Sequence, residues 1–148
     1  MLRKKGNKSD RTVMMENIIL DFFLSNFKIE LKPEYRVSTG IADFFGQIHN
    51  DYIILELKQS INDFYSGHGL NFVGTSNYMV VPSELVGFAI TFLRKENLNY
   101  VGVIEITEKG TARIITYPSI YSDNEFIYKR FPSTMFEPYH LRGYENHF

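Results

Sequence analysis

Cysteine is absent from this chain of 148 residues. Its absence excludes a disulfide framework, thiolate catalysis and the usual cysteine-based zinc sites. Histidine is scarce as well: the four histidines are scattered along the sequence, and no two of them have the spacing of metal ligands. A metal centre in this chain is therefore expected to use oxygen ligands rather than sulfur or imidazole.

Long apolar runs are also missing. No segment approaches the length of a membrane span. The basic N-terminus, MLRKKGNKSDR, is not followed by the uninterrupted apolar stretch and small-residue cleavage site of a secretory signal. We therefore expect a cytoplasmic protein with no membrane partner.

Net charge is small, at −1, so the overall charge makes no case for a nucleic-acid partner. The placement of charge is more informative, because basic residues gather around a single acid, Asp10, near the N-terminus. They are Arg3, Lys4, Lys5, Lys8 and Arg11. Residues 1–9 are interpreted as a basic flexible arm, which either follows the phosphates of a nucleic acid or is a solvated tail.

The composition is otherwise that of a folded protein, with 44% hydrophobic and 22% charged residues. The length suits one domain with a single core. Aromatic residues are abundant, 13 Phe and 10 Tyr, and beyond Pro118 they continue without a clear period. We therefore expect a domain over residues 10–118 and an aromatic C-terminal extension, residues 119–148, packed on it.

The first element expected is a helix from Arg11 to Phe27, with Ser9 or Asp10 as its N-cap. Apolar residues recur at helical spacing along one side of it, at Met15, Ile18, Ile19, Phe22 and Phe23. The residues one and two helical turns after Glu16 on the same side of the helix are apolar, so Glu16 is expected to point toward the core.

The next elements alternate between strand and helix. Residues 32–35 predict a turn, and two strands, 36–48 and 52–58, predict a hairpin, with a bulge or bend at Gly40 or Gly46. Then follow a helix that ends near Gly67, a buried strand over 78–81, a helix capped by Ser83, and strands over 100–106 and 111–117. This alternation implies parallel crossovers, and so an α/β sandwich with a mixed sheet covered by helices.

Asp43, Glu56 and Lys58 are set into otherwise apolar strands, where a charge is costly to bury unless it is paired or bound to metal. With a two-residue loop at 49–50 or 50–51, Asp43 faces Glu56 or Lys58, and either register puts all three on one face. Two carboxyls so placed repel each other, and a hard divalent cation relieves the repulsion.

In that arrangement the carbonyl of Leu57 is a further candidate oxygen ligand, and Lys58 would orient a water or stabilise charge on a phosphate. The alternative is a structural salt bridge from Lys58 to either acid.

These residues resemble the PD-(D/E)xK, or restriction-endonuclease-like, nuclease superfamily. Asp43 follows Ala42 where the motif has Pro, and Glu56-Leu57-Lys58 fits the second element. The following Gln59–Phe64 and the later Val80-Val81-Pro82 resemble the MmcB-like DNA repair branch. The resemblance covers about residues 10–117 and implies Mg²⁺-dependent hydrolysis of DNA, with Mn²⁺ as a substitute. It also implies a role in DNA repair, recombination or processing.

The superfamily often places a glutamate from the first helix beside the metal, and Glu16 is the matching candidate. Alternatively, Glu16 lies at the flank of the apolar face of its helix, or it pairs with Lys28 or Lys32. Ser60, Tyr65, His68 and Arg36 are the substrate-binding candidates, although Ser60 and Asp63 also suit helix capping and His68 suits a plain loop.

Two rival functions remain open at this point. One is a catalytically silent nuclease-fold module that binds nucleic acid or a protein, since a fold does not fix a function. The other is an interaction protein that uses its aromatic extension. DNA is the partner that the resemblance implies, and a homodimer is a further alternative, because one metal site cuts one strand.

Overall fold

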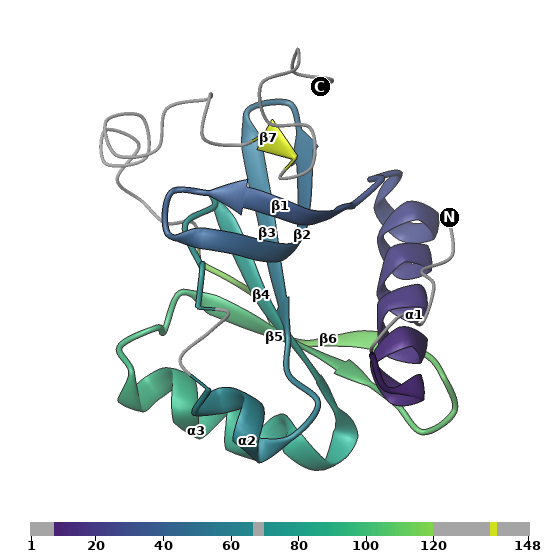
Figure 1. Cartoon of the computed structure of the whole chain (residues 1–148), viewed down its shortest axis with the longest axis vertical. Coiled ribbons are helices and arrows are strands. Elements are labelled where there is room, and N and C mark those ends of the chain that lie inside the picture. The colour runs from purple at the N-terminus through teal and green to yellow at the C-terminus, as the bar shows by residue number, and fades with distance from the viewer. Residues whose placement is uncertain (1–7, 67–69, 120–136, 139–148) are drawn as a thin grey trace.

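The chain, described by a computed structural model over residues 8–66, 70–119 and 137–138, forms a mixed sheet between two layers of helix (Figure 1). The strand order is β6-β5-β4-β3-β2-β1-β7. In chain order the strands are β1 (Lys32–Val37), β2 (Gly40–Ile48), β3 (Asp51–Leu57), β4 (Ser76–Pro82), β5 (Val101–Ile106), β6 (Ala112–Thr116) and β7 (Glu137–Pro138). The α/β class and the mixed sheet expected from the sequence are confirmed.

Helix α1 (Asp10–Phe27) covers one face of the sheet (Figure 1). Ser9 is its N-cap and accepts a hydrogen bond from the Thr12 amide, so the predicted helix is confirmed and begins one residue earlier. Met15, Ile19 and Phe23 are buried against strand residues such as Leu55 and Val80. This packing holds α1 beside the ends of β2 and β3.

The chain reverses between β1 and β2, where the sequence predicted one continuous strand from 36 to 48. That prediction is wrong, as is the turn predicted over 32–35, because Lys32–Val37 pairs with β2 as a separate antiparallel strand. Gly40 explains the difference. Its φ of 154° is one that L side chains rarely adopt, and it allows Ser38 and Thr39 to form a tight turn. Gly40 therefore marks a turn rather than a bulge.

The β2–β3 hairpin has the first of the two predicted registers. Ile48 pairs with Asp51 across the His49–Asn50 loop, and Phe44 pairs with Leu55. Strands β4 and β5 then run parallel to β3, so the predicted crossovers are confirmed.

The second face of the sheet is covered by α2 (Ile61–Phe64), the 3₁₀ turn η1 (Ser83–Leu85) and α3 (Val86–Lys95) (Figure 1). Phe64, Met79 and Phe92 belong to the core on this side. Helix α2 ends before Gly67, as predicted. Ser83 is not the N-cap of α3, because the chain first makes η1 and α3 begins after Leu85.

The two sheet edges differ. Strand β6 is antiparallel to β5, and β7 pairs with β1 through Tyr35 opposite Pro138. Apart from Ser119 and the β7 backbone, the predicted C-terminal extension lies outside the described residues, and so do positions 1–7 of the predicted arm. No helix in the described part is long and apolar enough to span a membrane.

Candidate active site

The site begins where β2 and β3 separate. The last backbone pair of this ladder is Phe44–Leu55. Beyond it, the Asp43 amide donates to Glu56 Oε1 and the Leu57 amide donates to Asp43 Oδ2, each at 2.7 Å. Side chains thus take the place of backbone acceptors at the fork, and both acids are held there from opposite strands.

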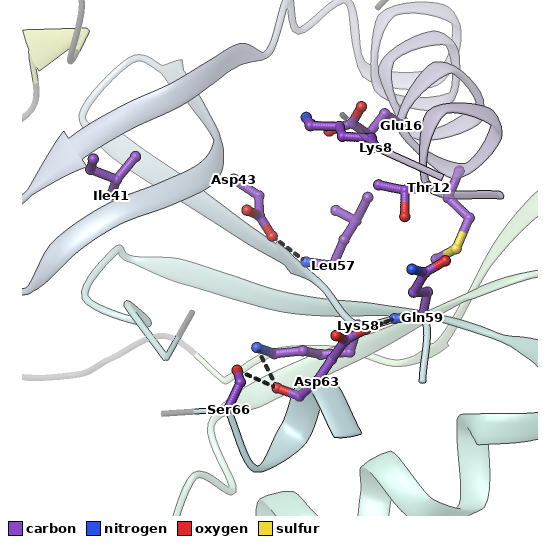
Figure 2. Close-up of a pocket in the computed structure, with 11 residues that line it drawn as sticks. Lys8, Thr12, Glu16, Ile41, Asp43, Leu57, Lys58, Gln59, Asp63 and Ser66 are labelled. Carbon is purple, nitrogen blue, oxygen red and sulfur yellow. Dashed lines mark hydrogen bonds and ion pairs between the residues drawn. The ribbon is translucent and has the colours of Figure 1, made fainter. Parts of the chain in front are cut away.

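A cavity of about 300 Å³ lies at this fork, between α1, the ends of β2 and β3, and α2 (Figure 2). Its lining contains both acidic and basic side chains. The lining residues are Lys8, Thr12, Met15, Glu16, Ile41, Asp43, Leu57, Lys58, Gln59, Asp63 and Ser66. Of the predicted catalytic residues, Asp43, Lys58 and Glu16 line this one space.

Glu56 is fully buried and is not among the residues that line the cavity. Its second oxygen, Oε2, accepts from the Asn71 amide at 3.3 Å and from Asn71 Nδ2 at 3.1 Å. Burial, followed by the nearby charge of Asp43, raises the pKa of Glu56 to about 8. In this structure Glu56 therefore serves as a hydrogen-bond acceptor that fixes the Asp43 backbone.

Asn71 is a site residue that the sequence reasoning missed. Besides its bonds to Glu56, its Nδ2 donates to the Ile41 carbonyl at 3.1 Å and its Oδ1 accepts from Thr39 Oγ1 at 2.6 Å. The side chain is 6% exposed. Asn71 thereby ties the β1–β2 turn to the buried carboxylate.

Asp43 lies among charges of both signs. Burial raises its pKa most, and the charge of Glu16 raises it further, whereas the Leu57 hydrogen bond and the charges of Lys58 and Lys8 lower it. Its Oδ1 accepts no hydrogen bond from the described residues. Figure 2 shows the carboxylate of Asp43 with the Lys8–Glu16 pair on one side and Lys58 on the other.

Glu16 is only 5% exposed, so its predicted inward orientation is confirmed. Its Oε2 lies 2.5 Å from Lys8 Nζ. The predicted pairings with Lys28 or Lys32 are not the one observed, since Lys32 lies 3.3 Å from Glu30 instead. The acid of the first helix thus shares the cavity with a lysine of the predicted arm.

Lys58 is 4% exposed, and its Nζ donates to the Asp63 carbonyl at 3.1 Å. The Asp63 carboxylate in turn accepts from the amides of Gln59 and Ser60. These bonds confirm the capping role of Asp63 at the start of α2. They also hold the turn that directs Lys58 toward the cavity.

The predicted substrate-binding residues lie outside the cavity lining, as far as the described residues show. Ser60 is the N-cap of α2, and Tyr65, 69% exposed, packs edge-on against Phe88. Arg36 is on β1, and His68 lies outside the described residues. Contact with substrate stays a prediction for all four.

Asp43 and Glu16 are the predicted metal ligands whose carboxylates line the cavity; the third lining carboxylate, Asp63, already accepts from the Gln59 and Ser60 amides. Within residues 8–66, 70–119 and 137–138, no group of three or more acidic or histidine side chains is placed to hold a metal ion. Mg²⁺ in proteins commonly takes one or two carboxylates and keeps several waters, so this pair fits it. The wider predicted ligand set, which adds Glu56 and the Leu57 carbonyl, stays a prediction.

Comparison of the chain with protein-family models, curated proteins and solved structures finds no match, so its function is inferred from the site itself.

Proposed function

We propose that the protein is a Mg²⁺-dependent nuclease that hydrolyses DNA phosphodiester bonds in repair, recombination or processing. The observation that carries the proposal is the cavity at the β2–β3 fork, where two acids, Asp43 and Glu16, meet a buried lysine, Lys58. A divalent cation with an adjacent ammonium suits the negative charge of a phosphodiester under attack.

Each residue has a distinct part in this chemistry. Asp43 and Glu16 would hold the ion, which supplies charge to activate water and to neutralise the phosphate. Lys58 donates hydrogen bonds to the charge that develops on the phosphate oxygens. Glu56 keeps Asp43 in place because its side chain accepts a hydrogen bond from the Asp43 backbone amide. Because Asp43 and Glu16 come from different elements, their spacing depends on how α1 packs.

The order of elements also supports the PD-(D/E)xK assignment. A helix comes first, then three antiparallel strands that end in Glu56-Leu57-Lys58, then a helix and a strand parallel to the third. The sandwich with a central mixed sheet is the architecture that the resemblance implies. The restriction-endonuclease-like fold is part of this proposal.

The test is cleavage of single-stranded, duplex, flap and junction DNA with Mg²⁺ or Mn²⁺. Asp43→Asn and Lys58→Met should each lower the rate by at least about a hundredfold, because each removes a charge at the reacting phosphate. Asp51→Asn, at an exposed hairpin position, is the matched control and should cut at the wild-type rate. Full activity in folded Lys58→Met would overturn the mechanism.

A catalytically silent module that binds nucleic acid or a protein is the second candidate. The observation in its favour is that both oxygens of Glu56 already accept hydrogen bonds from N–H groups. A wild-type protein that neither binds Mn²⁺ nor cuts any of these substrates, yet retains DNA in a gel-shift assay, would favour it over the nuclease.

A further inference from the structure

Lys8 lines the site together with Lys58, and among the described residues it is the lysine whose ammonium forms an ion pair with an acid of the cavity. Its Nζ is 2.5 Å from Glu16 Oε2, and both residues line the cavity with Asp43. The charge of Lys8 also acts on Asp43 in the direction expected of a nearby cation. Lys8 therefore pairs directly with Glu16 and, together with Lys58, offsets the negative charge of Asp43.

The position of Lys8 is fixed by the start of α1. Ser9, the next residue, caps the helix and also donates from Oγ to Gln59 Oε1 at 3.1 Å. Gln59 lines the cavity too. This contact joins Ser9 to the residues that follow β3. The backbone next to Lys8 is thereby held in place beside the cavity.

We propose that Lys8 is the built-in counter-cation of the site and competes with the divalent ion for Glu16. This inference rests on the proposed metal site. An ammonium and a divalent cation bound to the same carboxylate repel each other, so each weakens the binding of the other. Metal binding therefore releases Lys8 from Glu16, and the freed ammonium is close to where a phosphate would lie.

The first experiment is a calorimetric titration of the full chain with Mn²⁺. Lys8→Met should bind Mn²⁺ about three- to tenfold more tightly than wild type, the size expected for loss of one partly exposed ion pair. Lys8→Arg keeps the competing charge and should bind no more tightly than wild type. Lys32→Met is the control, since it removes a lysine paired with exposed Glu30.

The second experiment uses the wild-type protein and so does not depend on a variant folding. Amine-reactive ester labelling is quantified by mass spectrometry for each lysine, with and without Mg²⁺. Labelling of Lys8 should rise when Mg²⁺ is added, because its amine leaves Glu16. Labelling of Lys32 should not change.

Three results would overturn the inference while leaving the metal site in place. The first is Mn²⁺ binding by Lys8→Met that is no tighter than that of wild type. The second is an increase in Mn²⁺ affinity in Lys32→Met as large as that in Lys8→Met. The third is labelling of Lys8 that does not change when Mg²⁺ is added. A wild-type protein and a Lys8→Met variant that both fail to bind Mn²⁺ would instead overturn the metal site itself, and this inference with it.

Discussion

A carboxylate buried among N–H donors is a demanding arrangement for a single residue. Glu56 is fully buried, and its two oxygens accept from one backbone amide on β2 and from both nitrogens of Asn71. Each bond offsets part of the cost of removing the carboxylate from water. Asn71 supplies two of the three, so the stability of this region depends on it.

Replacing Asn71 tests that dependence. Asn71→Ala should lower the free energy of unfolding by about 2–4 kcal/mol, because it removes the Nδ2 donor to the Ile41 carbonyl and one of the two donors to Glu56 Oε2. Urea unfolding followed by circular dichroism measures the change. Asn26→Ala is the control: Asn26 is exposed and donates only to a helix carbonyl, so its loss should cost less than about 0.5 kcal/mol. Equal losses in the two variants would contradict the role given to Asn71.

Residues of the site differ in how far the sequence reveals them. Asp43 and Glu56 could be placed together because both registers considered for the two-residue hairpin loop put them on the same face of the sheet. The structure has one of those two registers. Asn71 could not be placed with them, since its side-chain partners lie 15, 30 and 32 positions away and no local pattern links them. The role of Lys8 could not be predicted either, because nothing in the sequence distinguishes Lys8 from the other basic residues near the N-terminus.

The elements around the site depend on two glycines in opposite ways. Gly40 begins β2 with a φ of 154°, and a Cβ there would lie 2.9 Å from Asn71 Oδ1. Gly87 lies in α3, and a Cβ there would meet nothing within 4 Å. The first glycine is required by the turn, whereas the second only adds flexibility to the unfolded chain.

Alanine at these two positions should therefore change stability with opposite signs. Gly40→Ala should lower the free energy of unfolding by about 1–3 kcal/mol, since it strains the turn and displaces Asn71. Gly87→Ala should raise it by roughly 0.5 kcal/mol through helix propensity. Thermal melts of the two variants beside wild type give the comparison, and a Gly40→Ala protein as stable as wild type would refute the account of the turn.

At this scale the sequence predicts well wherever the apolar pattern is unambiguous. Helix α1 follows from its helical periodicity, strand β4 from a short apolar run that ends at Pro82, and the β5–β6 hairpin from two strand segments around residues 108–110. The β1–β2 turn was missed because Ser38 and Thr39 are not strong turn formers, while Pro33, a usual strand breaker, lies inside β1 opposite Phe44. Tertiary pairing overrides local preference there.

The burial of Glu56 affects the stability of the whole molecule and makes it depend on pH. The pKa of Glu56 is about 8 in the folded protein against an ordinary value of 4.5, mainly because of burial. Between these values the folded state binds more protons than the unfolded state, so stability falls as pH rises through this window. The raised pKa of Asp43 acts in the same direction. Glu105, with a pKa lowered by its hydrogen bond from Arg113, acts only below about 4.5 and in the opposite direction.

Metal-free protein should therefore lose roughly 1–3 kcal/mol of unfolding free energy between pH 5.5 and pH 8. Urea titrations in EDTA at both values measure it. Glu56→Gln, which stays uncharged, should show a much smaller loss over the same interval. A Glu56→Gln protein with the wild-type slope would assign the pH dependence to other groups.

The exchange of hydrogen bonds at the fork has a consequence for anyone who alters this protein. Asp43 and Glu56 each accept a backbone amide from the opposite strand, so they help hold β2 and β3 together as well as carry charge. Truncating either side chain should remove a hydrogen bond between the strands as well as a charge from the proposed site, and the two effects could not then be told apart. Asp43→Asn separates architecture from charge, because the remaining amide oxygen can still accept from the Leu57 amide. By the same reasoning, a copy of this fold could lose its chemistry through such a replacement and still keep its shape.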